Sequence, residues 1–127
     1  MRFPTLAEVL LIHQQIVAET DGQSGLQDQS LLDSALKAAE NCHYYDQADE
    51  IVCAVTYAYH LCMVHAFIDG HKRFAAVVSE TFLFFNGWQL TLENKELVDM
   101  FLEIADGVLL RDAIEATFSR CAISIGD

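Results

Sequence analysis

Nine consecutive residues near the middle of the chain carry side chains that together can bind a phosphate group and transfer it. They are His65, Ala66, Phe67, Ile68, Asp69, Gly70, His71, Lys72 and Arg73. The imidazole of His65 titrates near neutral pH and can take the proton of an attacking hydroxyl. The carboxylate of Asp69 can bind Mg²⁺ that bridges phosphates. The adjacent ammonium and guanidinium of Lys72 and Arg73 suit the phosphate oxygens themselves.

The spacing of these polar residues favours one shared site. On a continuous helix the aspartate, lysine and arginine follow the histidine by four, seven and eight positions, so all four side chains share a face. If the helix instead breaks at Gly70, the free backbone amides of Gly70, His71 and Lys72 start a second helix and form an anion site. Taken singly, each residue also has a structural interpretation: a core histidine, a turn aspartate and two solvated cations. The joint spacing is what favours function.

Two strongly apolar runs flank these nine residues, from Ile51 to Val64 and from Phe74 to Phe85. A single helix through both runs would have about 35 residues, far above the usual length in a globular domain. Two central helices are therefore more consistent with the pattern. The predicted bounds are Glu50–Val64, capped by Asp49, and His71–Phe85, ended by Asn86-Gly87.

The rest of the chain shows helical periodicity as well. Further helices are predicted at Leu6–Glu19, Gln29–Ala39, Thr91–Ala105 and Leu110–Ile123, with Asn41–Gln47 as a connector and Trp88–Leu90 as an extended link. A capping box, Thr5 with Glu8, starts the first helix, and the second is expected to turn Leu31, Leu32, Ala35 and Leu36 inward. No strand pattern and no repeat is found. The prediction is one all-α domain, residues 1–127, of about six helices.

The composition excludes several classes of protein. With 53% apolar residues and one proline, the chain is expected to be globular rather than disordered. A net charge of −12 with only seven basic residues argues against nucleic-acid binding. The longest apolar run is shorter than the about 20 residues that cross a bilayer. The four cysteines form no C-x-x-C pair, which predicts free thiols in a reducing compartment. The N-terminal residues lead into a capped helix and not into a signal peptide, so the predicted location is the cytoplasm.

A metal site is an alternative interpretation of the same region. Its candidate ligands are His60, Cys62, His65 and His71. Their spacing lacks the paired ligands that are typical of structural zinc sites. Phosphate chemistry therefore explains the pattern better.

The nine-residue stretch resembles the signature of a known family. His65-x-Phe67-x-Asp69-Gly70-x-Lys72-Arg73 is similar to the pattern H-x-F-x-[DN]-[AG]-N-K-R of the Fic/Doc family, and its lysine resembles the Doc (death-on-curing) branch. Other similar segments are Thr5-Leu6-x-x-Val9, Gly25-Leu26, Leu31-Leu32-x-Ser34-Ala35-Leu36 and Phe85-Asn86-Gly87. The resemblance implies the all-α Fic fold, with a phosphate-binding motif between two central helices.

The resemblance also implies a function. Fic proteins usually transfer AMP from ATP to a protein hydroxyl, whereas the Doc toxin phosphorylates elongation factor Tu and stops translation. His65 would then activate the target hydroxyl, Asp69 would serve Mg²⁺ or the hydroxyl, and the phosphates of ATP would lie against a set of four residues: Gly70, His71, Lys72 and Arg73. Doc toxins are neutralised by an antitoxin protein that binds their groove. The family's own inhibitory pattern, [ST]-x-x-x-E-[GN], is not matched, because Leu36 precedes Glu40-Asn41, so inhibition is expected from another chain.

Three positions depart from the family pattern. His71 replaces the asparagine of the motif, Phe74 replaces a frequent threonine, and Met63 replaces a frequent arginine. An imidazole is larger than an amide but still offers one hydrogen bond, and near a helix N-terminus it is expected to be neutral. An alternative is therefore a member that binds a nucleotide or peptide without turnover. The choice between phosphoryl and AMP transfer stays open, as do the oligomeric state and the roles of Arg111 and Arg120.

Overall fold

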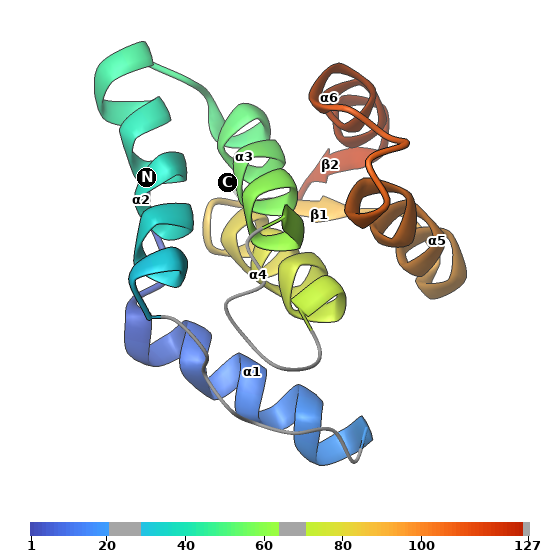
Figure 1. Cartoon of the computed structure of the whole chain (residues 1–127). Helices are drawn as coiled ribbons and strands as arrows, with labels where there is room; N and C mark the ends of the chain where they lie inside the picture. Colours follow the sequence, from blue (N-terminus) through green and yellow to red (C-terminus); the bar gives the residue numbers. More distant parts are fainter. Residues whose placement is uncertain (21–28, 64–70, 126–127) are drawn as a thin grey trace.

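Six helices and one short two-stranded sheet make up the part of the chain that the computed structural model describes, residues 1–20, 29–63 and 71–125 (Figure 1). In order, the elements are α1 (Leu6–Thr20), α2 (Gln29–Asp46), α3 (Glu50–Met63), α4 (His71–Phe85), β1 (Trp88–Leu90), α5 (Asn94–Ala105), α6 (Arg111–Cys121) and β2 (Ala122–Ser124). The predicted all-α class and helix number are confirmed.

Helix α3 lies in the middle of the fold and contacts α2, α4, α5 and α6. Eight of its fourteen residues are buried, which confirms the prediction that a helix apolar on all sides is central. Asp49 caps it as predicted, since a side-chain oxygen accepts a hydrogen bond from the backbone N–H of Val52 at 2.9 Å. Aromatic rings join the layers, because Phe82 of α4 contacts both Tyr57 of α3 and Phe3.

Helix α4 has the predicted bounds, His71–Phe85. Its end follows from Gly87, which adopts a φ of 86° that side chains with a Cβ rarely tolerate. The side chain of Asn86 also ties this end to the N-terminal segment. Its Oδ1 accepts from the backbone N–H of Arg2 at 2.8 Å, and its Nδ2 donates to the backbone oxygen of Arg2 at 2.9 Å. The start of the chain is thus fastened to the C-terminal end of α4.

The prediction for the second helix was too short. The segment Asn41–Gln47, predicted to be a connector, is mostly the last part of α2. The polar and aromatic side chains of Tyr44 and Tyr45 suggested a loop, but both are exposed and leave the helical backbone undisturbed. The helix ends where Gln47 takes a φ of 57° and the N–H of Ala48 reaches the carbonyl oxygen of Cys42. Leu31, predicted to face inward, is 42% exposed, whereas Leu32, Ala35 and Leu36 are buried.

The prediction that no strand is present was also wrong. Strand β1 pairs with β2 in an antiparallel register of Trp88 with Ser124, Gln89 with Ile123 and Leu90 with Ala122. This pairing also explains two shifted helix bounds. Thr91 donates from both its N–H and its hydroxyl to the carbonyl of Cys121, so α5 starts only at Asn94. Helix α6 stops at Cys121 because the following residues enter β2.

Arg111, whose role was open, joins the start of α6 to α3. Its Nη2 donates to the hydroxyl of buried Thr56 at 2.9 Å, and its Nη1 lies 3.4 Å from Nε2 of His60. A guanidinium can only donate, so that ring nitrogen must accept and be unprotonated. Burial, and then the charge of Arg111, lower the pKa of His60.

This lowered pKa predicts an acid-sensitive contact between α3 and α6. Because the folded state binds a proton at His60 less readily than the unfolded state, its contribution to stability is complete above the unfolded pKa of about 6.5 and is lost as the pH falls below it. We expect the free energy of unfolding to decrease between about pH 7 and pH 5, and to decrease less in His60→Gln. Urea titrations at several pH values measure both; parallel pH profiles of the two proteins would contradict the assignment.

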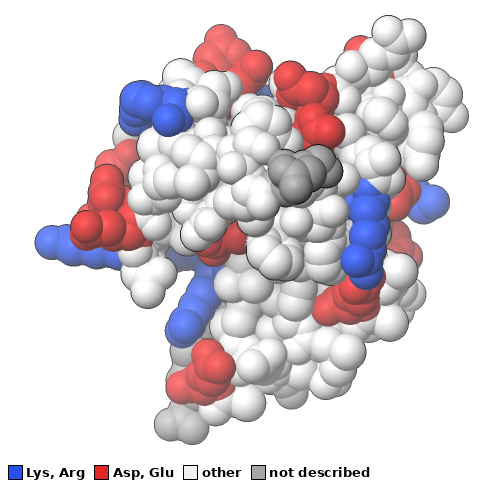
Figure 2. Space-filling view, turned by 180° about the vertical axis from the view of Figure 1, so that it is seen from behind, with Lys and Arg blue, Asp and Glu red and all other residues white. Residues whose placement is uncertain are grey.

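The cysteines and the charged surface residues of the described part can also be compared with what the sequence predicts. Cys53 and Cys62 are buried, Cys42 and Cys121 are half-buried, and all four are free. None of the described helices combines the length and apolar character needed to cross a membrane. On the face shown in Figure 2, basic side chains stand apart from one another, with acidic ones near them.

Candidate functional site

The described part of the predicted motif is the first turn of α4. Lys72 is half-buried and Arg73 is exposed there. His71 is the first residue of α4, but its side chain lies outside the described part, as do His65, Asp69 and Gly70 entirely. The predicted cation pair is therefore at the start of a helix, where free backbone N–H groups and the helix dipole attract anions. The convergence of His65 with Arg73 stays a prediction.

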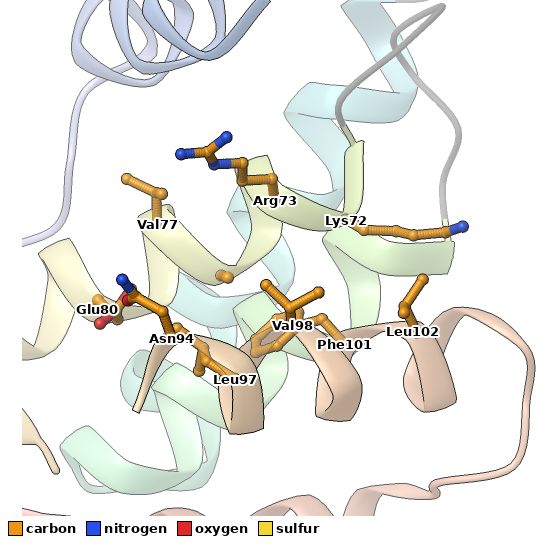
Figure 3. Close-up of a pocket in the computed structure, with 10 residues that line it drawn as sticks. Lys72, Arg73, Val77, Glu80, Asn94, Leu97, Val98, Phe101 and Leu102 are labelled. Atoms are coloured by element: carbon orange, nitrogen blue, oxygen red, sulfur yellow. The ribbon is translucent and has the colours of Figure 1, made fainter. Parts of the chain in front are cut away.

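A groove of about 540 Å³ lies between α4 and α5, beside these cations (Figure 3). Ten residues line it: Lys72, Arg73, Ala76, Val77, Glu80, Asn94, Leu97, Val98, Phe101 and Leu102. Most of this lining is apolar, and the polar groups are concentrated toward its ends. Both the volume and the composition are typical of small-molecule sites, in which a few polar groups orient a ligand against apolar walls.

The guanidinium of Arg73 points away from this groove, toward α1. There Nη2 lies 3.7 Å from Oε2 of Glu19, and both side chains are 55% exposed. A smaller cavity of about 230 Å³ opens on that side, lined by Ile12, Gln15, Ile16, Glu19, Arg73 and Val77. Arg73 thus stands between two hollows, and Glu19 competes with any anion for its charge.

If Glu19 no longer competes for the charge of Arg73, anions should bind more tightly. An exposed ion pair contributes about 0.2–1 kcal/mol, so Glu19→Gln should raise the affinity for inorganic tripolyphosphate roughly two- to fivefold and change stability by less than about 1 kcal/mol. The gain should shrink at high salt. Isothermal titration calorimetry measures this, with the exposed Glu115 changed to Gln as a control. An unchanged affinity in Glu19→Gln would show that Arg73 takes no part in anion binding.

Two polar residues of the groove, Glu80 and Asn94, were not predicted. Figure 3 shows their side chains together at the end of the groove opposite Lys72. Glu80 comes from α4 and is partly buried, and burial raises the pKa of its carboxyl group above the usual value. One signal was visible in the sequence: Glu80 is the single charged residue between Arg73 and the end of α4. Asn94, on the next helix, gave no comparable signal.

Two of the three departures from the family pattern lie on described residues. Phe74 is 1% exposed and packs edge-on against His13, with ring centroids 5.7 Å apart. It belongs to the core and does not line the groove. Met63 is 41% exposed at the end of α3. Neither side chain therefore replaces an anion ligand with another polar group.

Metal binding has limited support from the described residues. No group of three potential metal-ligating side chains occurs among residues 1–20, 29–63 and 71–125. Of the alternative set, Cys62 is fully buried, and burial raises the pKa of its thiol to about 12, which disfavours the thiolate that metals bind. His60 is held by Arg111. The predicted magnesium ligand, Asp69, lies outside the described residues.

The fold and site define a mostly helical domain in which a cationic helix start borders a ligand-sized groove. A family model described as Fic/DOC family matches residues 3–83, which is more than half of the chain. The chain belongs to the Fic/Doc family, whose members are typically transferases. The match spans α1 to nearly the end of α4 and includes the nine residues from His65 to Arg73. A comparison with curated proteins gives no match.

Proposed function

We propose that this protein is a Doc-like toxin that transfers a phosphoryl group, or AMP, from ATP to a hydroxyl of a protein target. A translation factor such as elongation factor Tu is the proposed target, and inhibition of translation is the proposed result. Family membership supports transfer chemistry in general. The observation that carries the proposal further is the cation pair Lys72 and Arg73 at the start of α4, beside a groove of about 540 Å³.

Each motif residue has a role in this proposal. Lys72 and Arg73 bind the phosphates of ATP, together with the first backbone amides of α4 from Gly70 and His71. His65 accepts the proton of the target hydroxyl while the hydroxyl oxygen forms a bond to phosphorus. The bond from that phosphorus to the leaving group breaks at the same time, which releases ADP in phosphoryl transfer or pyrophosphate in AMP transfer. Asp69 holds Mg²⁺, which neutralises phosphate charge when bound.

A second chain is the proposed source of inhibition. The wall of the groove exposes large apolar side chains on α5, since Val98 is 54% and Leu102 is 41% exposed. An antitoxin that covers this wall would bury that surface and block the access of ATP. The proposed setting of both proteins is the cytoplasm.

One labelling experiment tests the proposal. The purified protein is incubated with a bacterial lysate and MgATP that carries the label in either the γ-phosphate or the α-phosphate. Transfer of γ-label alone would indicate a kinase, and transfer of α-label would indicate an adenylyltransferase. The experiment is repeated with purified elongation factor Tu. Absence of transfer from both labels, with protein that is folded by circular dichroism, would refute the proposed activity.

A second candidate function is binding without turnover. It is favoured by the orientation of Arg73, which points to Glu19 and not into the groove, and by His71 in place of the motif asparagine. We then expect His71→Asn to switch on label transfer that the natural protein lacks, because the smaller amide leaves room for the phosphates. His43→Asn, outside the motif, is the control. Measurable transfer by the natural protein, at a rate equal to that of His71→Asn, would exclude this candidate.

A further inference from the structure

A carboxyl group that has no partner among the described residues lies in the groove, at the end opposite the cation Lys72. Glu80 is partly buried against apolar residues of α4 and α5. Within residues 1–20, 29–63 and 71–125, no side chain or backbone group forms a hydrogen bond or ion pair with it. Withdrawing a carboxyl group from water without a donor costs free energy. An arrangement of this kind in a groove indicates a ligand that supplies the missing donor.

Asn94 places a second acceptor at the same end of the groove. It is the first residue of α5, and its side chain lies beside that of Glu80 in Figure 3. Its amide has no partner among the described residues either. A carboxyl group and an exposed amide group thus lie at the same end of the groove, and the amide can offer its oxygen as a second acceptor. A ligand group that offers a hydrogen-bond donor would therefore pair with the carboxyl group of Glu80.

The opposite end of the groove carries a positive charge, that of Lys72. Lys72 precedes Glu80 by eight residues on α4, which corresponds to roughly 12 Å along the helix axis. Between them the groove is lined by Ala76, Leu97, Val98 and Phe101. The lining therefore suits an elongated ligand with an anionic end, a flat or apolar middle and a donor-bearing end. In a nucleoside triphosphate the phosphates form the anionic end, the ribose follows, and the flat ring of the base carries its donor groups at the far edge.

We propose that Glu80 and Asn94 select the base of the nucleotide by accepting hydrogen bonds from an exocyclic amino group. This inference depends on the proposed function, because it assumes that the phosphates lie at Lys72 and Arg73. Adenine, guanine and cytosine carry such an amino group, whereas uracil presents carbonyl oxygens, one of which would face the carboxyl group of Glu80. Glu80 and Asn94 are then specificity-determining residues. Loss of their hydrogen bonds to the base should weaken the preference among nucleotides without weakening the binding of the phosphates.

Binding measurements with three probes separate base from phosphate. ATP, UTP and inorganic tripolyphosphate are titrated calorimetrically into the natural protein, Glu80→Leu and Glu80→Gln. We expect ATP to bind about tenfold more tightly than UTP to the natural protein, since one good base contact discriminates by roughly that amount. Glu80→Leu should lose most of this preference and bind tripolyphosphate within twofold of the natural protein. Glu80→Gln keeps one acceptor oxygen and should retain part of the preference for ATP over UTP.

Glu103→Leu is the matched control, because Glu103 is an exposed glutamate of α5 that does not line the groove. It should keep the full preference for ATP over UTP. If Glu80→Leu is folded and keeps that preference, or if the natural protein has none, the inference is overturned while phosphate binding and transfer can still stand. If neither ATP nor tripolyphosphate binds and no label is transferred, the proposed function fails and this inference fails with it.

Discussion

His65→Ala is expected to abolish label transfer from ATP and, in cells that produce the protein, to abolish toxicity. A positioned general base contributes about 10²–10⁴-fold to the rate, so transfer to the protein target should fall by at least about a hundredfold. Binding of ATP should change little, because the proposed phosphate ligands are Lys72, Arg73 and the amides at the start of α4. A loss of turnover without a loss of binding distinguishes a base from a phosphate ligand.

The control for this change is His43→Ala. His43 lies near the end of α2, and its Nδ1 is 3.3 Å from the carbonyl oxygen of Ala48, far along the sequence from the motif. It should leave transfer and toxicity unchanged. Transfer rates are measured with purified elongation factor Tu, and toxicity by colony formation. Full toxicity of His65→Ala would show that the base has been assigned to the wrong residue.

Phe74→Thr is expected to destabilise the fold strongly, although threonine is the frequent family residue at that position. Phe74 is 1% exposed and packs against His13 of α1, so the smaller side chain would leave a cavity and bury a hydroxyl. Such large-to-small changes cost about 3–5 kcal/mol. For a domain of this size that corresponds to a decrease in Tm of roughly 10–20 °C. Thermal unfolding followed by circular dichroism measures it.

Phe84→Thr provides the matched comparison on the same helix. Phe84 is 65% exposed, so the same substitution there removes few contacts and should lower the Tm by only a few degrees. Similar Tm values for the two variants would show that Phe74 does not contribute to the core as described. The expected contrast also means that the motif cannot be restored to the family pattern at this position without compensating changes in α1.

The fold could be predicted where apolar periodicity and end signals agreed. Helix α4 is the clearest case, because its apolar run is bounded by Gly70 before and Asn86-Gly87 after. The length of α2 could not be predicted, because exposed Tyr44 and Tyr45 carry no inward-facing signal and the helix end depends on the backbone of Gln47. Strands of three residues have too little pattern to recognise, and their pairing joins segments far apart in the sequence.

The candidate site could be predicted only where its residues are close in sequence. Lys72 and Arg73 are adjacent to each other, and their placement at the start of a helix followed from the glycine before them. Glu19, Glu80 and Asn94 reach the site from α1, α4 and α5, so their roles depend on helix packing. A lone glutamate in an apolar helix was the one sequence signal that pointed to Glu80. Residues 64–70, which include the predicted base, lie outside the described part.

Both ends of the described chain are fastened to the C-terminal end of α4. Asn86 exchanges two hydrogen bonds with Arg2, and the N–H of Ile125 donates to the carbonyl oxygen of Gly87 at 2.8 Å. Lys72 and Arg73 lie at the other end of this 15-residue helix, roughly 22 Å away along its axis. A fluorescent reporter or an affinity handle joined to either terminus would thus leave the route of a substrate open. Immobilised protein should accordingly remain suitable for capturing its target.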